Sequence, residues 1–371
     1  MKKWSALFLA MVMTLSLCAC GKDGSGHATD APTTAPTVPA KPTDPTYDPG
    51  SNGPSKPENS GNDGPATPQT GNFNLLTEFV ICYYDGDERE EEKMELVYDE
   101  DYCLIGIKGY ENGKLTGEMT FDKETGKMLT QVQYNADGGV DGTGVYTYDE
   151  KGNELSYVTT LSDGSKDFYR ERTYTAEGWL ESSTYGWGEQ SPCYREVYTY
   201  DDYGNKLTQL LYIDDACHSE ITYENSYEDG KLRQIKTWQN GMLAWGESYD
   251  ADGNLIAEDS YNDQGEVFST TAYTYENGKL MLRSISSDGV ESSRQEYTYN
   301  EAGQLVEVCH FDEGHTHGRD VYAYKNGVLV NVKLYDHTEL EGEYTLSYQR
   351  AEVSEELSEK LTAMYEAMME F

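Results

Sequence analysis

Three of the six histidines fall within eight residues, and imidazoles gathered in this way can bind a metal ion. The segment His310-Phe-Asp-Glu-Gly-His315-Thr-His317 contains a predicted hairpin loop, which places His310 and His315 on either side of the turn. His315 and His317 share one strand face because strand side chains alternate. Zinc and other borderline metals prefer such nitrogen donors. The sequence therefore offers His310, His315 and His317 as a candidate metal site, against the simpler interpretation of exposed histidines beside a turn. His218 and His337 stand alone and are interpreted as surface residues.

Covalent catalysis has little support in the sequence. Cys309 directly precedes His310, but adjacent strand residues point to opposite faces, so the two are not expected to act as a nucleophile pair. Cys193 and Cys217 are 24 residues apart, so a coiled array would stack them and an open meander would place a strand between them. No catalytic residue and no cofactor is assigned. Five cysteines follow the leader, an odd number that leaves at least one thiol unpaired: Cys82, Cys103, Cys193, Cys217 and Cys309.

Two acidic segments resemble the opening of a calcium loop, Asp250-Ala-Asp252-Gly253-Asn254 and Asn135-Ala-Asp137-Gly138. Neither continues into the full ligand series and terminal glutamate of a helix–loop–helix site. Aspartate, asparagine and glycine at these places are already explained by turn geometry. Cations remain possible partners through loose association with the acidic surface.

A sequence motif built on tyrosine and glycine recurs along most of the chain. Its repeats form the scaffold that would hold the candidate metal site in place. Tyr148-Asp-Glu-Lys-Gly152 and Tyr200-Asp-Asp-Tyr-Gly204 are two of its copies. Successive steps from Tyr148 to Tyr324 are 26, 26, 27, 22, 26, 24 and 25 residues, with Tyr227 filling one gap. A period near 25 indicates a repeat architecture in which each unit packs against its neighbours.

Each repeat predicts two strands and two turns. Segments such as Val145-Tyr-Thr-Tyr148 alternate aromatic and β-branched residues with a period of two, which indicates strands with two different faces. The glycine after each tyrosine closes a hairpin loop of three to five residues, often with a bulge. A second set of turns lies midway between these, as at Asp288-Gly289 and Glu313-Gly314. The predicted fold is all-β: an elongated antiparallel hairpin array, either an open meander or a β-solenoid.

The phrase Tyr-x-Tyr-Asp-x-x-Gly-x-x-Leu resembles the tyrosine–aspartate (YD) repeats of Rhs-type bacterial surface and secreted proteins. The best copies are residues 146–155 and 198–207. Shorter units, such as Tyr110-Glu-Asn-Gly-Lys-Leu115, are similar to MORN-related β-repeats. The resemblance covers about residues 95–350 and implies hairpin repeats, because most of its positions encode turns. The chain lacks the large core cassette and C-terminal toxin domain of full Rhs proteins, so toxin delivery is not implied.

The first residues predict export and anchoring. Lys2 and Lys3 precede an apolar run that ends in Leu17-Cys-Ala-Cys20, which resembles the lipobox of bacterial lipoproteins. The resemblance implies cleavage after residue 19 and lipidation of Cys20, as by palmitate. Ten of the eleven prolines then lie between Pro32 and Pro68, so residues 20–71 are predicted to be the anchor and a disordered spacer. The protein is expected on the outer leaflet of the cell membrane.

The charge excludes one class of partner. The chain carries −39, and without Lys2, Lys3 and the spacer's three lysines and six acids about −38 remains on the repeats. Such a field repels nucleic acid and anionic lipid headgroups and favours cations or basic partners. The simpler interpretation is a solvated surface that keeps open sheet edges from pairing.

The C-terminal residues change period. Residues 353–371 place Leu357, Leu361, Met364, Met368 and Phe371 at steps of four and three, after a predicted Ser354 N-cap. We expect an amphipathic helix that caps the open end of the repeat domain, residues 72–352. The function favoured by the sequence is a membrane-anchored binding or adhesion scaffold without catalysis, whose tyrosine rows contact a cell-wall saccharide, a peptide or a protein. The alternative is an envelope-associated hydrolase or metal-dependent enzyme using His310, His315 and His317.

Overall fold

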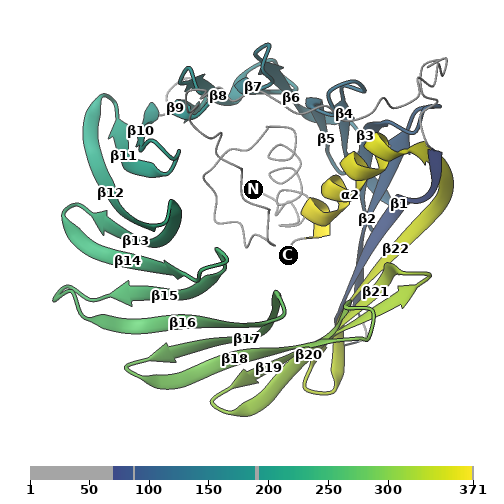
Figure 1. Ribbon diagram of the computed structural model, residues 1–371. Coiled ribbons are helices and arrows are strands. Elements are labelled where there is room, and N and C mark those ends of the chain that lie inside the picture. The colour runs from purple at the N-terminus through teal and green to yellow at the C-terminus, as the bar shows by residue number, and fades with distance from the viewer. Residues whose placement is uncertain (1–69, 87, 189–191, 370–371) are drawn as a thin grey trace, which may run out of the picture.

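The structure is a computed structural model that describes residues 70–86, 88–188 and 192–369 (Figure 1). The predicted leader, the lipidated Cys20 and the spacer lie outside the described residues. No helix in this described part of the chain is both long and apolar enough to cross a membrane.

Twenty-two antiparallel strands and one helix make up the described fold. The strands are β1 Thr70–Asp85, β2 Glu88–Tyr98, β3 Leu104–Glu111, β4 Lys114–Phe121, β5 Met128–Tyr134, β6 Val140–Tyr148, β7 Glu154–Leu161, β8 Lys166–Tyr174, β9 Leu180–Trp187, β10 Tyr194–Tyr200, β11 Lys206–Ile213, β12 Ala216–Glu228, β13 Lys231–Gln239, β14 Met242–Tyr249, β15 Leu255–Tyr261, β16 Val267–Glu276, β17 Lys279–Ser287, β18 Val290–Tyr299, β19 Leu305–Asp312, β20 His315–Lys325, β21 Val328–Asp336 and β22 Glu339–Ser354. The helix is α2, Glu355–Met369. The predicted all-β class with a C-terminal helix is confirmed.

The sheet closes on itself, so the predicted open meander or solenoid is wrong. Each strand pairs with the next along the chain, and β1 also pairs with β22 from Thr70↔Ser354 to Tyr83↔Gly342 (Figure 1). β1 and β22 have sixteen residues each, and Phe79 of β1 and Leu346 of β22 form a buried register pair. A sheet with this many twisted strands curls, and pairing the two ends removes both open edges. The result is a 22-stranded barrel.

The turns follow the predicted chemistry. In the Tyr148 repeat, Asp149 Oδ1 accepts the backbone N–H of Asn153 at 2.8 Å, and Gly152 has a φ of +93°. The register shifts between Thr147 and Tyr148, which places the predicted bulge directly before the loop. Asp250 uses its Oδ1 in the same way, accepting N–H groups from its own loop, so this carboxylate serves the turn. Several of the midway turns, such as Asn240-Gly241, Asp288-Gly289 and Glu313-Gly314, are two-residue loops with positive φ at both positions, and the others are longer loops.

The repeated tyrosine joins neighbouring strands through its hydroxyl. In four repeats it donates a hydrogen bond of 2.8–2.9 Å to a backbone carbonyl 19 or 20 residues earlier, at or near the start of the preceding strand. We call these contacts the tyrosine latches. They are Tyr148 to Met128, Tyr174 to Glu154, Tyr200 to Leu180 and Tyr299 to Leu280.

The two faces of the wall differ. The threonine between two repeat tyrosines points outward, and its hydroxyl bonds a cross-strand hydroxyl at 2.7–2.8 Å; examples are Thr147 with Ser156 and Thr199 with Thr208. The opposite face carries α2, which lies inside the ring beside β1 and β22 (Figure 1). The tyrosines beside those threonines therefore point inward.

Helix α2 covers the inner side of the seam between β1 and β22 rather than the open end of a stack. The Ser354 hydroxyl accepts the N–H of Leu357 at 3.2 Å, as predicted for an N-cap. Tyr365 accepts the N–H of Leu76 at 2.9 Å, lies 2.8 Å from the Tyr98 hydroxyl and stacks on Phe73. The expected position was wrong because ring closure leaves the described sheet without an end to cap.

The described cysteines are free thiols. Cys193 lies just before β10 and Cys217 lies on β12, so β11 separates them along the sheet. This is the arrangement expected of laterally paired hairpins and not of a coiled solenoid.

Candidate functional site

An array of aromatic rings covers part of the inner face across β6 to β10. Tyr98 of β2 contacts α2 and therefore lies on the inner face. The register pairs between neighbouring strands show which residues of β3 to β6 lie on that same face. These pairs are Leu96↔Ile107, Ile107↔Met119, Met119↔Gln131 and Gln131↔Gly144. Tyr146 lies two residues after Gly144 and therefore on the same face. Its neighbour across the strand pair is Tyr157.

Six rings follow one another without a gap in this aromatic array. Tyr146 and Tyr157 stack at 4.2 Å between centroids, and Tyr157 and Phe168 are 6.0 Å apart. Trp187 then contacts three rings: Phe168 at 5.5 Å, Tyr185 at 5.7 Å and Tyr194 at 5.6 Å. Tyr185 and Tyr194 are nearly parallel, with 5.4 Å between centroids. Trp187 is 52% exposed, so a large apolar surface stays open to a partner.

Paired charges border the aromatic array. The Glu154 side chain is only 2% exposed and accepts two hydrogen bonds from Arg170, from Nε at 2.8 Å and Nη2 at 2.9 Å. Arg172 Nη1 lies 3.5 Å from the same carboxylate, and its buried Nε has no hydrogen-bond partner among the described residues. Arg170 also lies over the Tyr157 ring at 5.7 Å. Two guanidinium groups thus share one buried carboxylate beside the rings, which leaves donor capacity for an additional acceptor.

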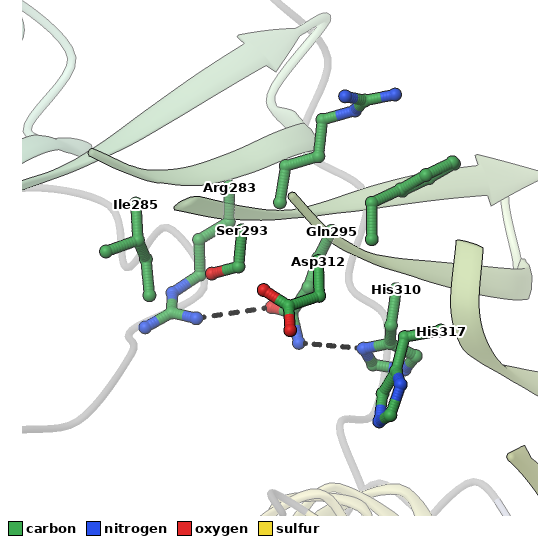
Figure 2. Close-up of a pocket in the computed structure, with 9 residues that line it drawn as sticks. Arg283, Ile285, Ser293, Gln295, His310, Asp312 and His317 are labelled. Atoms are coloured by element: carbon green, nitrogen blue, oxygen red, sulfur yellow. Dashed lines mark hydrogen bonds between the residues drawn. The ribbon is translucent and has the colours of Figure 1, made fainter. Parts of the chain in front are cut away.

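A small pocket of about 250 Å³ lies on another arc of the ring, between β17 and β20 (Figure 2). A chain of polar contacts crosses it. Arg283 Nη1 lies 3.5 Å from Gln295 Oε1, Gln295 Nε2 lies 3.2 Å from His310 Nδ1, and His310 Nε2 lies 2.9 Å from Asp320 Oδ2. Both ring nitrogens of His310 are therefore already in contact with protein groups. The remaining lining residues are Ile285, Ser293, Arg294, Phe311, Asp312 and His317.

The structure brings only part of the predicted histidine cluster together. His310 and His317 both line the pocket, whereas His315 is exposed and pairs with Asp312 across the Glu313-Gly314 turn. Among the described residues, the group of three donors that lie within 4.8 Å of one another is His317, Asp336 and His337. The predicted trio is not such a group. Cys309 pairs with Arg319 and Glu296 on the face opposite His310, as expected from alternation.

Sequence reasoning missed Asp336 and treated His337 as an isolated surface residue. Two signals were present. His317 and Asp336 each lie nine residues from the Asn326-Gly327 turn, so a hairpin centred there places them side by side. In addition, His337 begins a turn whose second residue is Thr338, where most two-residue turns of this chain have glycine.

Comparison with known proteins gives no family. No protein-family model matches the chain, and no curated protein is similar to it in sequence. A solved structure of TcdB2-TccC3 without its hypervariable C-terminal region is 11% identical, with a TM-score of 0.33; the match covers 74% of this chain but only 19% of the other. A porin-like protein from Bacteroides uniformis is 10% identical, with a TM-score of 0.27; the match covers 74% of this chain and 98% of the other. The chain thus spans about a fifth of the toxin chain, and similarities this low carry no functional argument.

Proposed function

We propose that this chain is a non-enzymatic binding protein held outside the cell membrane by a lipid on Cys20, and that its aromatic array binds a saccharide. The six contiguous rings across β6 to β10 carry this proposal, with the exposed Trp187 as the principal contact. Aromatic faces pack against the apolar C–H faces of sugar rings, while neighbouring polar groups bind the hydroxyls. Arg170 and Arg172, whose side chains are partly exposed beside the rings, supply such groups.

Closure of the sheet favours a saccharide over a peptide. Peptides commonly bind β-proteins by adding a strand to a free sheet edge. Every described strand already pairs on both sides, so this mode is closed to a peptide partner. Recognition must then use side chains, and the aromatic array is the most extensive run of ring contacts among the described residues. The acidic charge disfavours phosphate-rich polymers, which leaves neutral or amino-substituted sugars as the expected ligands.

Titration with cell-wall oligosaccharides, followed by tryptophan fluorescence and calorimetry, tests this proposal. Trp187→Ala removes the exposed ring and should weaken binding by roughly 5- to 30-fold, equivalent to about 1–2 kcal/mol. Tyr212→Ala is a matched control, since Tyr212 pairs with Arg195 on the outer face of the same sheet. If wild-type protein retains no oligosaccharide, or if Trp187→Ala binds as well as Tyr212→Ala does, the proposal is refuted.

The alternative of an envelope hydrolase or metal-dependent enzyme using His310, His315 and His317 has less support. His310, which lines the pocket, contacts the carboxylate of Asp320 through Nε2, but its other ring nitrogen contacts Gln295. A general base needs that nitrogen free to accept a proton from a nucleophile or water. Release of reducing ends from wall polymers, lost in His310→Ala, would favour the enzyme.

A further inference from the structure

Three metal-binding side chains meet where the β19–β20 and β21–β22 hairpins reach the same rim of the ring. His337 Nδ1 lies 2.8 Å and His317 Nδ1 lies 3.8 Å from Asp336 Oδ1. One donor atom from each residue lies within 4.8 Å of the others, and the two imidazole rings are 5.5 Å apart between centroids. Two imidazole nitrogens and a carboxylate oxygen thus converge on one point.

The backbone fixes the positions of these three residues. Asp336 pairs with Gly318 in the β20–β21 ladder, so it lies beside the residue that follows His317. The N–H of His337 donates to the carbonyl of His317 at 2.7 Å, which ties the β21–β22 turn to β20. His317 and Asp336 therefore project from paired strands, and His337 projects from a turn that this hydrogen bond fixes to β20, so a bound ion would need little further ordering of the chain.

The turn that contains His337 differs from most of its counterparts. Asparagine or aspartate opens seven of the eight other two-residue turns with a positive φ at the opening position in the described chain, and glycine closes seven, the exception being Asp215; these turns begin at Asn112, Asp214, Asp229, Asn240, Asn277, Asp288, Glu313 and Asn326. His337 takes the opening position with a φ of +50°, and Thr338 takes the place of glycine. Histidine, like asparagine and aspartate, is enriched among non-glycine residues with positive φ, so this turn accepts an imidazole. The convergence of the three donor atoms, and not the conformation of the turn, favours a metal site.

We propose that His317, Asp336 and His337 form a binding site for one divalent ion of the zinc class. Zinc bonds imidazole nitrogen and carboxylate oxygen at about 2.0–2.2 Å, which places donors of a tetrahedral site roughly 3.3–3.5 Å apart. The separations here bracket that value, and the side chains, 40–65% exposed, are free to adjust. Calcium and magnesium prefer all-oxygen sites, so the nitrogen donors select against them.

The ion would connect two hairpins at the edge of the pocket in Figure 2, because His317 belongs to both sites. Three protein donors leave a fourth position of a tetrahedral ion to water or to an oxygen atom of a bound molecule. This set differs from the trio expected from the sequence. His310 already uses both ring nitrogens, and His315 lies outside the donor group.

Zinc titration of the metal-free full-length protein by calorimetry tests the site. A millimolar excess of Mg²⁺ should be present to occupy the dispersed carboxylates. Wild-type protein should bind one Zn²⁺ per chain. His337→Asn keeps a residue suited to positive φ and removes the imidazole, and His317→Ala removes the second nitrogen donor. Each variant should weaken binding at least about tenfold, since losing even an outer partner of a metal ligand costs 10- to 100-fold.

His315→Ala is the matched control, as it removes an exposed histidine two residues from His317. It should leave the zinc affinity unchanged. Zinc should also raise the melting temperature of wild type and of His315→Ala, but not that of His337→Asn, whose circular dichroism should match wild type. The site does not exist if wild type binds no stoichiometric Zn²⁺, if the affinity of His337→Asn equals that of wild type, or if His315→Ala loses as much affinity as His317→Ala.

Discussion

Removing a single hydroxyl tests whether the repeated tyrosine holds neighbouring strands together. Tyr200→Phe keeps the ring and its packing against Trp179 but deletes the tyrosine latch to the carbonyl of Leu180, a bond of 2.8 Å. If the latch is structural, the variant should keep the fold and lose a defined amount of unfolding free energy.

The expected loss follows from the surroundings of the bond. A typical intramolecular hydrogen bond contributes about 0.5–1.5 kcal/mol net, and a buried acceptor left unpaired adds a desolvation cost. Tyr200 is partly buried, so water reaches the freed carbonyl only in part. We expect Tyr200→Phe to lose ~1–2 kcal/mol. The quadruple variant at Tyr148, Tyr174, Tyr200 and Tyr299 should lose about four times as much if the sites are independent.

Urea unfolding followed by circular dichroism measures this loss, with the m-value unchanged if the unfolded state is unaffected. Tyr203→Phe is the matched control, because Tyr203 is 63% exposed and its hydroxyl remains in water in the folded state. Tyr203→Phe should change stability by less than ~0.5 kcal/mol. Equal midpoints for Tyr200→Phe and Tyr203→Phe would show that the latches are incidental and that packing alone sets the repeat.

Four further outcomes are expected. Burial raises the pKa of Tyr348 from 10.0 to about 12, so its contribution to stability is full below pH 10 and is lost as pH rises toward 12 in alkaline unfolding. Burial alone would raise the pKa of Asp250, but hydrogen bonds from Asn254 outweigh it and lower this pKa. In acid unfolding, the contribution of Asp250 to stability should therefore be lost as pH falls through the lowered pKa. Gly318→Ala should cost ~1–3 kcal/mol in urea unfolding, because its Cβ would lie 2.5 Å from the carbonyl oxygen of Tyr335. Cys20→Ala should release the protein into the medium instead of the membrane fraction, and continued membrane retention would contradict the lipid anchor.

Local residues made the strands and turns predictable. Asp149, Gly152 and the alternation before Tyr148 act within about ten residues of one another, so their consequences can be followed directly in the sequence. Closure depends on contacts between the two ends of the domain, such as Arg350 Nε with Asn72 Oδ1 across 278 residues. A repeating pattern gives each strand its neighbour but does not specify whether the first and last strands meet.

The same distinction applies to the histidines. The sequence groups His315 with His317 because strand side chains two residues apart lie on the same face, which can be deduced from neighbouring residues alone. The structure instead joins His317 with Asp336 and His337, whose proximity comes from the pairing of β20 with β21. Pairing distances around each turn, rather than clusters of similar residues, are therefore the better guide to sites in a hairpin array.

Ring closure also changes the interpretation of the acidic surface. Acids that protect open sheet edges are unnecessary where every described strand pairs on both sides. The net charge of −39 then serves solubility or the selection of partners. It acts differently on the two proposed ligands. A divalent cation is drawn to the rim at His337, whereas a neutral sugar at Trp187 is indifferent to the field. The aromatic array on β6 to β10 and the metal group on β20 to β22 occupy different arcs of the ring (Figure 1), so either can fail without the other.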